Sequence, residues 1–233
     1  MISVIVPLYN EGERVSALLD HLRRCPGRGE VVLADASDQP GSLAVIAELE
    51  ARLEGDRMIR LLRCRAPGRA VQMNAGAAGC RGSVLLFLHC DTRLPRAAAR
   101  RIRQRIAGGH VWGWFDLRLD ARGPIYRLLE RMIRARARAT GIATGDMAMF
   151  VEREVFAGER GFAEIALMED VEMSRRLKRR GRPAVIAETA LTSARRWRQN
   201  GVLRTVLLMW KLRFLYWRGH SPERLAAVYD DVR

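Results

Sequence analysis

The sequence predicts an α/β fold in which helices cover both faces of a mainly parallel sheet. Apolar stretches of strand length alternate with stretches of helical periodicity through residues 1–95, and such alternation requires crossover connections between parallel strands. The apolar segment Val84–Leu88 shows no alternation, which is typical of a central strand buried on both faces. Several predicted strands end in acidic or amide residues. Parallel strands bring such ends to one edge, where open α/β sheets bind ligands.

The first of these strands is expected to end at Pro7, because proline cannot donate to a sheet ladder. Up to residue 95, the expected strands are 2–6, 31–34, 58–62 and 84–88, and the expected helices are 15–24, 43–53 and 70–78. The polar strand ends are Asn10, Glu11, Asp35, Asp38 and Asp91. By itself, Asp91 would either hold a cation that bridges to phosphates or cap the following helix, and local context does not decide between these interpretations.

The second half of the chain continues the alternation with less regular spacing. Expected helices are 96–106, 125–139 and 171–180, and expected strands are 111–119, 147–151 and 184–187. Within 111–119, apolar residues alternate with others, which predicts a half-exposed strand. Because no internal repeat or low-complexity linker interrupts the chain, we expect a single domain over residues 1–233.

Composition leaves two interpretations of the charge open. The net charge is +15, and of the 41 basic residues all but Lys178 and Lys211 are arginine. This excess indicates either a basic surface for nucleic acid or anionic membrane, or a compositional bias towards arginine. The four cysteines form no C-x-x-C pair, which favours reduced thiols in the cytosol. The N-terminus enters a strand directly, so we expect no signal peptide and a cytoplasmic location.

Residues 202–218 form a mostly apolar predicted helix that is interrupted by basic residues. Its charges are too many for a transmembrane span. Arg204, Lys211 and Arg218 are spaced by seven, so they share one face of the helix, and aromatic residues fill much of the rest. Two interpretations fit: an interfacial helix on anionic lipid at the inner face of the membrane, or a helix packed on its own domain or on a homodimer partner.

Five motifs give the chain a resemblance to a known family. They are Val6-Pro7-Leu8-Tyr9-Asn10-Glu11, Ala34-Asp35-Ala36-Ser37-Asp38, Gly68-Arg69-Ala70-Val71-Gln72-Met73-Asn74-Ala75-Gly76, His89-Cys90-Asp91-Thr92 and Leu167-Met168-Glu169-Asp170-Val171-Glu172. With these motifs in the family's order, the chain resembles a family 2 glycosyltransferase from roughly residue 3 to residue 225, and within that family a small bacterial subgroup. These are inverting enzymes with the GT-A fold, a Rossmann-like mixed, mainly parallel sheet flanked by helices.

The resemblance implies a nucleotide-binding half at 1–95, an acceptor and catalytic half at 96–190, and a C-terminal helical extension at 191–233. The implied activity is metal-dependent transfer of one sugar from a nucleotide-diphosphate sugar, expected to be a UDP-sugar, to an acceptor hydroxyl. The implied nucleotide-binding residues are Pro7, Tyr9, Glu11, Asp35, Arg69 and Asn74. Asp35 would bind the base, Asp91 would bind Mg²⁺ or Mn²⁺ on the diphosphate, and Asp170 would be the general base with Glu169 beside it.

Elementary chemistry agrees with these residue types. A nucleoside diphosphate leaves readily once its developing charge is neutralised, which a divalent cation does. Such a cation often needs one or two carboxylates in addition to the substrate phosphates, so a single Asp91 suffices. A carboxylate at Asp170 can accept the proton of the attacking hydroxyl, a step typically worth ~10²–10⁴-fold in rate. From the residues alone, Asp170 could also be a helix N-cap, and Asp35 could simply form a turn.

The chain departs from the family pattern at two places. His89 occupies the first position of the metal-binding D-x-D motif, either as a ligand or as a structural residue. Arg196 and Trp197, expected on the acceptor side, match the end of a Q-x-x-R-W motif, but Ser193 stands where glutamine would. Because that motif marks processive synthases, its partial loss implies transfer of a single sugar.

Three other functions stay open at this stage. A nucleotidyltransferase would show a Gly-rich basic loop after its first strand, which is absent here, and a catalytically silent transferase is compatible with His89. A nucleic-acid-binding protein is not favoured, because no known binding module is recognisable. The expected partners are therefore the nucleotide-sugar donor and an acceptor, which the basic apolar helix suggests is lipid-like.

Overall fold

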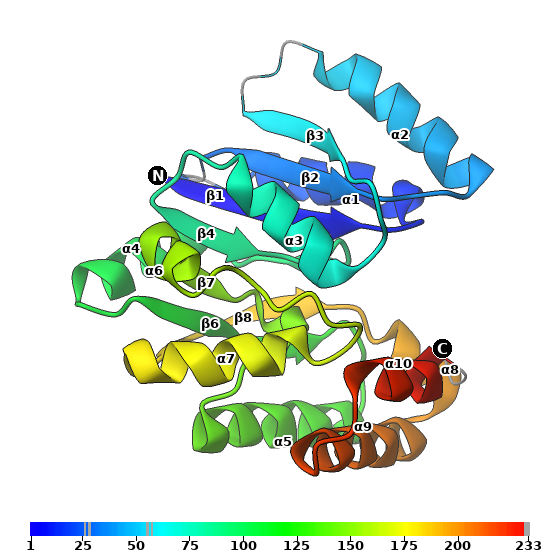
Figure 1. Ribbon diagram of the computed structural model, residues 1–233, viewed down its shortest axis with the longest axis vertical. Coiled ribbons are helices and arrows are strands. Elements are labelled where there is room, and N and C mark those ends of the chain that lie inside the picture. Colours follow the sequence, from blue (N-terminus) through cyan, green and yellow to red (C-terminus); the bar gives the residue numbers. More distant parts are fainter. Residues whose placement is uncertain (26, 28, 55, 57, 231–233) are drawn as a thin grey trace.

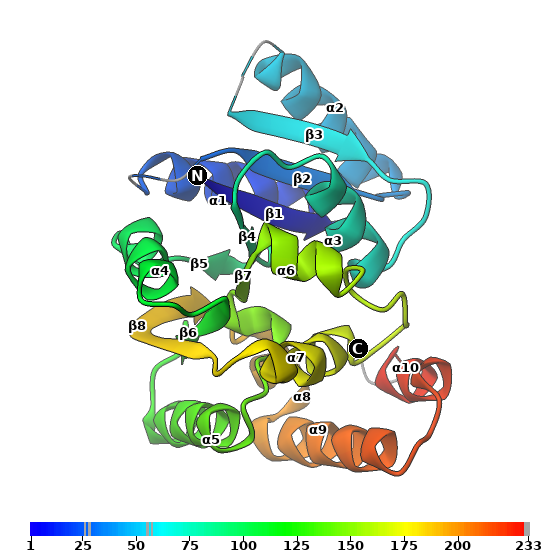
Figure 2. The same cartoon turned by 60° about the vertical axis from the view of Figure 1, so that its left-hand side comes forward.

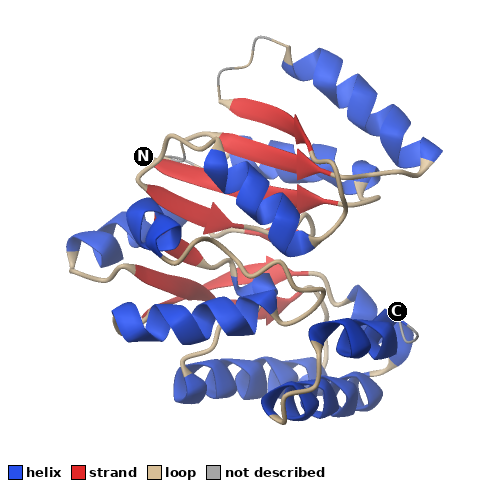
Figure 3. Cartoon of the chain, viewed as in Figure 1, coloured by secondary structure: helices blue, strands red, loops and turns tan. Residues whose placement is uncertain are grey.

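The structure is a computed structural model that describes residues 1–230 apart from 26, 28, 55 and 57. The last part of the predicted helical extension, 231–233, therefore lies outside the described residues. A mixed sheet with strand order β3-β2-β1-β4-β7-β6-β8-β5 runs through the molecule and is flanked by helices (Figures 1 and 3).

The first half of the sheet is parallel, as the alternating sequence pattern predicts. Strands β1 (Ile2–Leu8), β2 (Val31–Asp35), β3 (Ile59–Arg63) and β4 (Val84–Phe87) pair side by side in one direction. Between them lie α1 (Gly12–Arg23), α2 (Pro40–Leu53) and α3 (Arg69–Ala78). Side chains of α1 and α2 pack on one face of these strands, and those of α3 pack on the other. The non-alternating apolar runs are thus buried on both faces.

The prediction that β1 ends at Pro7 is wrong, because β1 continues to Leu8. Pro7 pairs with Ala34 of β2, whereas the pairing of β1 with β4 stops at Ile5. Ile5 accepts a hydrogen bond from Leu88 on the β4 side, and Pro7 faces that same side two residues later, beyond the end of β4. Proline is tolerated in the strand because no β4 carbonyl lies opposite its missing N–H.

The second half of the sheet is mixed in direction. Strand β7 (Phe150–Glu152) is antiparallel to both β4 and β6 (Trp112–Leu119), and β8 (Ala184–Thr192) is parallel to β6 and antiparallel to β5 (Thr92–Arg93). A side chain on Gly113 would place its Cβ 2.1 Å from the carbonyl oxygen of Ala184, so the β6–β8 contact requires glycine there. Helices α4 (Ala98–Ala107), α5 (Pro124–Thr140), α6 (Arg153–Gly158) and α7 (Glu169–Arg180) complete this half.

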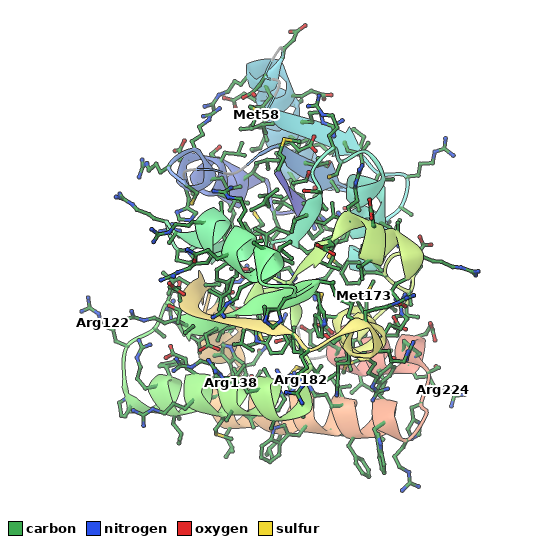
Figure 4. The ribbon with its side chains drawn as sticks, turned by 90° about the vertical axis from the view of Figure 1, so that its left-hand side faces the viewer. Met58, Arg122, Arg138, Met173, Arg182 and Arg224 are labelled. Atoms are coloured by element: carbon green, nitrogen blue, oxygen red, sulfur yellow. The ribbon has the colours of Figure 1, made fainter. Side chains whose placement is uncertain are left out.

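Strand β6 corrects the prediction of a half-exposed strand at 111–119. Every residue of β6 except Arg118 is buried. Trp112 and Trp114 pack with α7, whose Met173 reaches into the same core (Figure 4), and Phe115 packs on the opposite face with Ile102 of α4. The alternation in the sequence reflects two different buried faces rather than one buried and one solvated face.

The C-terminal part forms a layer of helices beside the sheet. Helices α5 and α9 (Val202–Trp217) lie side by side, and α10 (Pro222–Asp230) packs against α9 (Figures 1 and 2). Short α8 (Arg195–Asn200) links β8 to this layer. No helix within the described ranges is both long and apolar enough to cross a membrane. The elements that the sequence pattern did not predict are short or peripheral: β5, α6, α8, α10 and the 3-10 helix η1 (Gly145–Met147), which occupies the start of the strand expected at 147–151.

Candidate active site

Two adjoining cavities open at the carboxyl ends of β1 and β4. The first, the polar cavity, has a volume of about 420 Å³ and is lined mainly by residues that follow these two strands and by α8. The second, the apolar cavity, has a volume of about 400 Å³ and lies among α5, α7 and α9. Both cavities are lined by Arg69, His89, Asp91, Arg195 and Arg196. Asp91 therefore lies between two cavities at the edge of the sheet where the sequence predicts a binding site.

Asp91 lies in the turn that follows β4 and does not cap a helix. Helix α4 begins at Ala98 and has Ala97 as its N-cap, without a side-chain cap bond, so the capping interpretation is wrong. The hydroxyl of Thr92 donates to Asp91 at 3.4 Å. Burial, together with the carboxylates of Glu11 and Asp146, raises the pKa of Asp91. The raised pKa shows that negative charge at this position is incompletely neutralised by the protein.

The surroundings of Asp91 fit a divalent cation that is shared with substrate phosphates. Asp146 follows β6 and α5 in the chain, yet it lines the apolar cavity and acts electrostatically on Asp91. Its Oδ1 atom is buried without a hydrogen-bond partner among the described residues. These residues contain no cluster of three or more His, Cys, Asp or Glu side chains that would enclose an ion. Hard cations bound by one or two carboxylates plus phosphate oxygens require no such cluster.

His89, at the first position of the D-x-D pattern, is a neutral imidazole. Burial and the positive charges of Arg69 and Arg196 lower its pKa to about 3. A Cβ atom on Gly145 would lie 2.5 Å from Nε2 of His89, so the ring packs directly against the Gly145 backbone. This close packing accounts for a glycine at position 145 and holds the following Asp146 near Asp91.

Glu169 and Asp170 form the opposite wall of the apolar cavity, at the start of α7. The helix begins at Glu169 after Met168, whose φ of 72° is left-handed and therefore strained for a non-glycine residue. The N-cap is Met168 and not Asp170, so the N-cap interpretation of Asp170 is wrong. Carboxylates in a first helical turn are stabilised by the helix dipole. The turn thus presents two adjacent acids to the cavity.

The two acids differ in their partners. Asp170 accepts hydrogen bonds from the backbone N–H groups of Gly145 at 2.8 Å and Val171 at 2.7 Å, while its burial raises its pKa. Burial and the neighbouring Asp170 raise the pKa of Glu169 to about 7. Arg69, at the N-terminus of α3, forms an ion pair with Glu169 at 3.9 Å. Asp170 is therefore oriented by fixed donors, as a proton acceptor must be.

The predicted nucleotide-binding residues fall into two groups. Pro7, Tyr9, Glu11 and Arg69 line the polar cavity together with Asp91. The hydroxyl of Tyr9 donates to Asp38 at 3.0 Å, which joins the loops after β1 and β2. This first group is brought together as the sequence predicts.

Asp35 and Asn74 form the second group and line neither cavity. Asp35 is fully buried, pairs with Arg63, and accepts a hydrogen bond from the Ser37 hydroxyl at 2.6 Å, so it stabilises the turn after β2. Asn74 exchanges hydrogen bonds of 2.9 and 2.8 Å with the backbone of Phe162. Both residues therefore make structural contacts rather than line either cavity.

Arg196 and Trp197 reach the site from α8. Arg196 lines both cavities, and its guanidinium lies 4.8 Å from the ring centre of Tyr229 in α10. Trp197 lines the apolar cavity. The two residues of the partial motif therefore connect the strand edge to the C-terminal helices.

Sequence reasoning missed four charged residues of the apolar cavity, Arg136, Asp146, Arg195 and Arg213. A signal existed for Arg136. It follows Leu129, Met132 and Ile133 at helical spacing, so it interrupts the apolar stripe of α5 with a charge. Arg213 does not belong to the series Arg204, Lys211 and Arg218, which are spaced by seven on α9, so that pattern did not identify it.

Comparison with known proteins supports the same chemistry. The family model for glycosyl transferase family 2 matches residues 3–156, more than half of the chain. A protein of Pseudomonas fluorescens, "Undecaprenyl-phosphate 4-deoxy-4-formamido-L-arabinose transferase", is 25% identical over 113 residues, 47% of this chain and 33% of that protein. The protein of the same name from Aeromonas hydrophila is 26% identical over 114 residues, 47% of this chain and 35% of that protein. The matched segment thus spans about a third of these relatives.

Solved structures share the fold over most of this chain. S. aureus TarS 1–349 in complex with UDP has a TM-score of 0.63 at 17% identity, covering 82% of this chain and 60% of that chain. Mannosyltransferase PcManGT from Pyrobaculum calidifontis, in complex with GDP-Man and Mn²⁺, has a TM-score of 0.64 at 21% identity, covering 82% of this chain and 56% of that chain. The predicted GT-A fold is confirmed.

Proposed function

Because this chain belongs to glycosyl transferase family 2, we propose that it transfers a single sugar, with inversion, from a nucleotide-diphosphate sugar to an acceptor hydroxyl. The observation that carries the proposal is the placement of Asp91 and Asp170 in the lining of one cavity, with Arg69 between the cavities. Such a site holds the leaving group on one side of the sugar and a proton acceptor on the other. Glycosyltransferase activity itself follows from the family.

On the donor side, we propose that Pro7, Tyr9, Glu11 and Arg69 contact the nucleotide in the polar cavity. Asp35 and Asn74 would then support the donor site through the turn after β2 and through α3. A UDP-sugar is our proposed donor, and the UDP-bound TarS structure supports it, although PcManGT holds GDP-Man. The donor half would be 1–95, followed by the catalytic half at 96–190 and the helical extension at 191–233.

Asp91, with Asp146 close by, would hold Mg²⁺ or Mn²⁺, as the Mn²⁺ of PcManGT suggests. When bound, the cation would neutralise the charge that develops on the leaving diphosphate. Arg69 adds a fixed positive charge next to the same place. The chain's own contribution is therefore to position the diphosphate rather than to form a covalent intermediate.

On the acceptor side, Asp170 would take the proton of the attacking hydroxyl as the acceptor oxygen forms its bond to the anomeric carbon. The bond from that carbon to the diphosphate oxygen breaks, and the diphosphate leaves with the electron pair. Glu169 lies beside Asp170 and would contact the acceptor, while Arg196 and Trp197 would border it. Ionised Asp170 is required, so its hydrogen bonds from Gly145 and Val171 serve the reaction by favouring the charged form.

We propose a lipid-like acceptor, reached from the inner face of the membrane through residues 202–218. The relatives are named as transferases that act on undecaprenyl phosphate, and α9 exposes apolar side chains. Pelleting with anionic vesicles at moderate salt tests the contact, and Trp217→Ser, at a side chain that is 69% exposed, should weaken it. A homodimer through the same face is the competing arrangement; it predicts a doubled mass in light scattering and no pelleting.

The central experiment is a thermal-shift screen of nucleotide sugars with and without Mn²⁺, followed by assays of two variants. A ligand in large excess over its Kd should stabilise the folded chain by a few kcal/mol. Asp91→Ala should lose the metal-dependent part of that shift. Asp170→Asn should keep it while kcat falls by ~10²–10⁴-fold. Absence of a metal-dependent shift with every nucleotide sugar would contradict the proposal and favour a catalytically silent protein.

A further inference from the structure

Two half-buried arginines of the apolar cavity, Arg136 and Arg213, form no ion pair among the described residues. Arg136 of α5 donates through Nη1 to the carbonyl oxygen of Ile142 at 2.7 Å, but its Nε atom is buried without a hydrogen-bond partner among the described residues. Arg213 of α9 lines the same cavity. No ion pair of the described residues includes either arginine. Buried donors of this kind are normally satisfied, so an orphaned guanidinium nitrogen indicates an absent acceptor.

The two guanidinium groups also act on each other. Burial and the positive charge of Arg213 lower the pKa of Arg136 to about 10, although Asp146 and Asp170 act in the opposite direction. Two cations that repel each other in a partly desolvated cavity are stabilised by an anion placed between them. Arginine binds phosphate oxygens through paired N–H donors, so a phosphate group suits this arrangement.

The cavity continues from the arginines to an apolar mouth. Its walls are Leu129, Met132 and Ile133 of α5 and Val206, Met209 and Trp210 of α9. Met132 and Trp210 are also 40% and 55% exposed, so they form the outer rim. These two helices lie next to each other in both orientations of the ribbon (Figures 1 and 2). A ligand with its anionic group at the arginines would therefore extend an apolar chain through this mouth.

Outside the mouth, the apolar surface continues along both helices. It consists of the exposed side chains Ile125, Leu128 and Met132 of α5 and Leu203, Leu207, Trp210, Phe214 and Trp217 of α9. Every exposed charged residue of α5 and α9 is basic, namely Arg131, Arg138, Arg204 and Lys211. A second copy docked on this face would bring like charges together, which is unfavourable. A lipid chain with an anionic head meets no such repulsion.

We propose that Arg136 and Arg213 form the headgroup subsite for a lipid phosphate, whose hydrocarbon chain lies between α5 and α9. The inference rests on the proposed function, since it names the acceptor class of the same site: the attacking hydroxyl is the P–OH of the lipid phosphate monoanion, whose proton Asp170 takes. The headgroup is placed beside Asp170 and Glu169, on the side of the cavity remote from the nucleotide residues Pro7 and Tyr9. A lipid phosphate and free phosphate share this chemistry, and the apolar mouth distinguishes them.

Calorimetric titration of the full chain with farnesyl phosphate, farnesol and inorganic phosphate tests the subsite, each ligand being added below its aggregation limit. Farnesyl phosphate should bind at least tenfold more tightly than either of the other two. Arg136→Gln and Arg213→Gln should each weaken farnesyl phosphate by ~10- to 100-fold and leave farnesol unchanged, because each removes charge-assisted hydrogen bonds. Arg131→Gln and Arg204→Gln, exposed on the same two helices, are the matched controls and should change the Kd less than twofold.

Arg136 also contacts the Ile142 carbonyl, so Arg136→Gln could act through folding. Arg213 makes no hydrogen bond to a backbone carbonyl among the described residues, so Arg213→Gln does not share this problem. UDP-sugar binding in the presence of Mn²⁺ is measured on every variant to confirm that the donor site is intact. Intact donor binding with equal affinities for farnesyl phosphate and farnesol would overturn the subsite alone. Unchanged farnesyl phosphate binding in Arg213→Gln would overturn it equally. If the wild-type chain does not bind a UDP-sugar at all, that result would instead contradict the proposed function.

Discussion

The clearest quantitative prediction concerns Glu169→Gln, a substitution that keeps the side-chain shape but removes the ionisable proton. Glu169 is 5% exposed, and burial together with Asp170 raises its pKa from 4.5 to about 7. Each pKa unit corresponds to about 1.4 kcal/mol of preference for the neutral form. Holding Glu169 ionised in the folded chain therefore costs up to about 3 kcal/mol of stability.

The pH window follows from the direction of the shift. Below pH 4.5, Glu169 is protonated in both folded and unfolded chains, so it imposes no cost. Between pH 4.5 and about 7, the unfolded chain releases the proton while the folded chain keeps it, so this residue lowers the free energy of unfolding as pH rises. Above about pH 7 the cost is constant. In Glu169→Gln this pH-dependent loss is absent.

Urea unfolding at a series of pH values between 5 and 8, without nucleotide or metal, measures the effect. The stability of Glu169→Gln relative to wild type should rise by about 2–3 kcal/mol across this range. Taking the difference between the two proteins cancels the pH dependence of every group that does not interact with Glu169. Glu154→Gln, at an exposed carboxylate in α6, is the control and should show a flat difference. A flat difference for Glu169→Gln as well would refute the assignment of a buried, destabilising acid.

Three further substitutions test the framework around the site. Gly113→Ala would place Cβ 2.1 Å from the Ala184 carbonyl oxygen and should cost more than ~2 kcal/mol in urea unfolding, whereas Gly158→Ala, with nothing within 4 Å, should be close to neutral. Gln72→Leu removes the side-chain N–H groups that hold the carbonyls of Leu8 and Ala34, at 2.5 and 2.8 Å, and should cost ~1–3 kcal/mol; an unchanged unfolding midpoint would contradict this. Gly145→Ala would place Cβ 2.5 Å from His89 and displace the N–H that binds Asp170, so kcat should fall at least tenfold while UDP-sugar binding persists. Equal loss of binding and kcat would contradict that last expectation.

The lining of the polar cavity could be predicted because several of its residues lie at the ends of parallel strands. Tyr9, Glu11 and Asp91 follow predicted strands directly, and the sheet necessarily brings such positions together. Asp35 follows a strand equally directly, yet its side chain points into the turn and pairs with Arg63. Strand position fixes where the backbone lies, whereas the partner that a carboxylate selects depends on neighbours such as Arg63 that no local pattern identifies.

Two features of the second half of the chain could not be predicted, for a different physical reason. Strand β6 is buried on one face by α4 and on the other by α7, which comes later in the chain, so the alternation in its sequence does not mark a solvated face. Asp146 illustrates the same limit, because it lies in a 3-10 turn of three residues with no periodicity of its own. Its place beside Asp91 results from antiparallel pairing of β7 with β4, a long-range contact that sequence periodicity does not encode.

The residues of the two cavities differ in whether they fall inside the segment that the family model matches. The matched family segment, residues 3–156, contains Asp91 and the residues proposed to bind the donor, whereas Asp170, Arg196 and Arg213 lie beyond it. Arg136 lies inside that segment and lines the cavity from α5. In the proposed function, acceptor specificity depends on single charges such as Arg136 and Arg213 on otherwise apolar walls, which motif comparison does not detect.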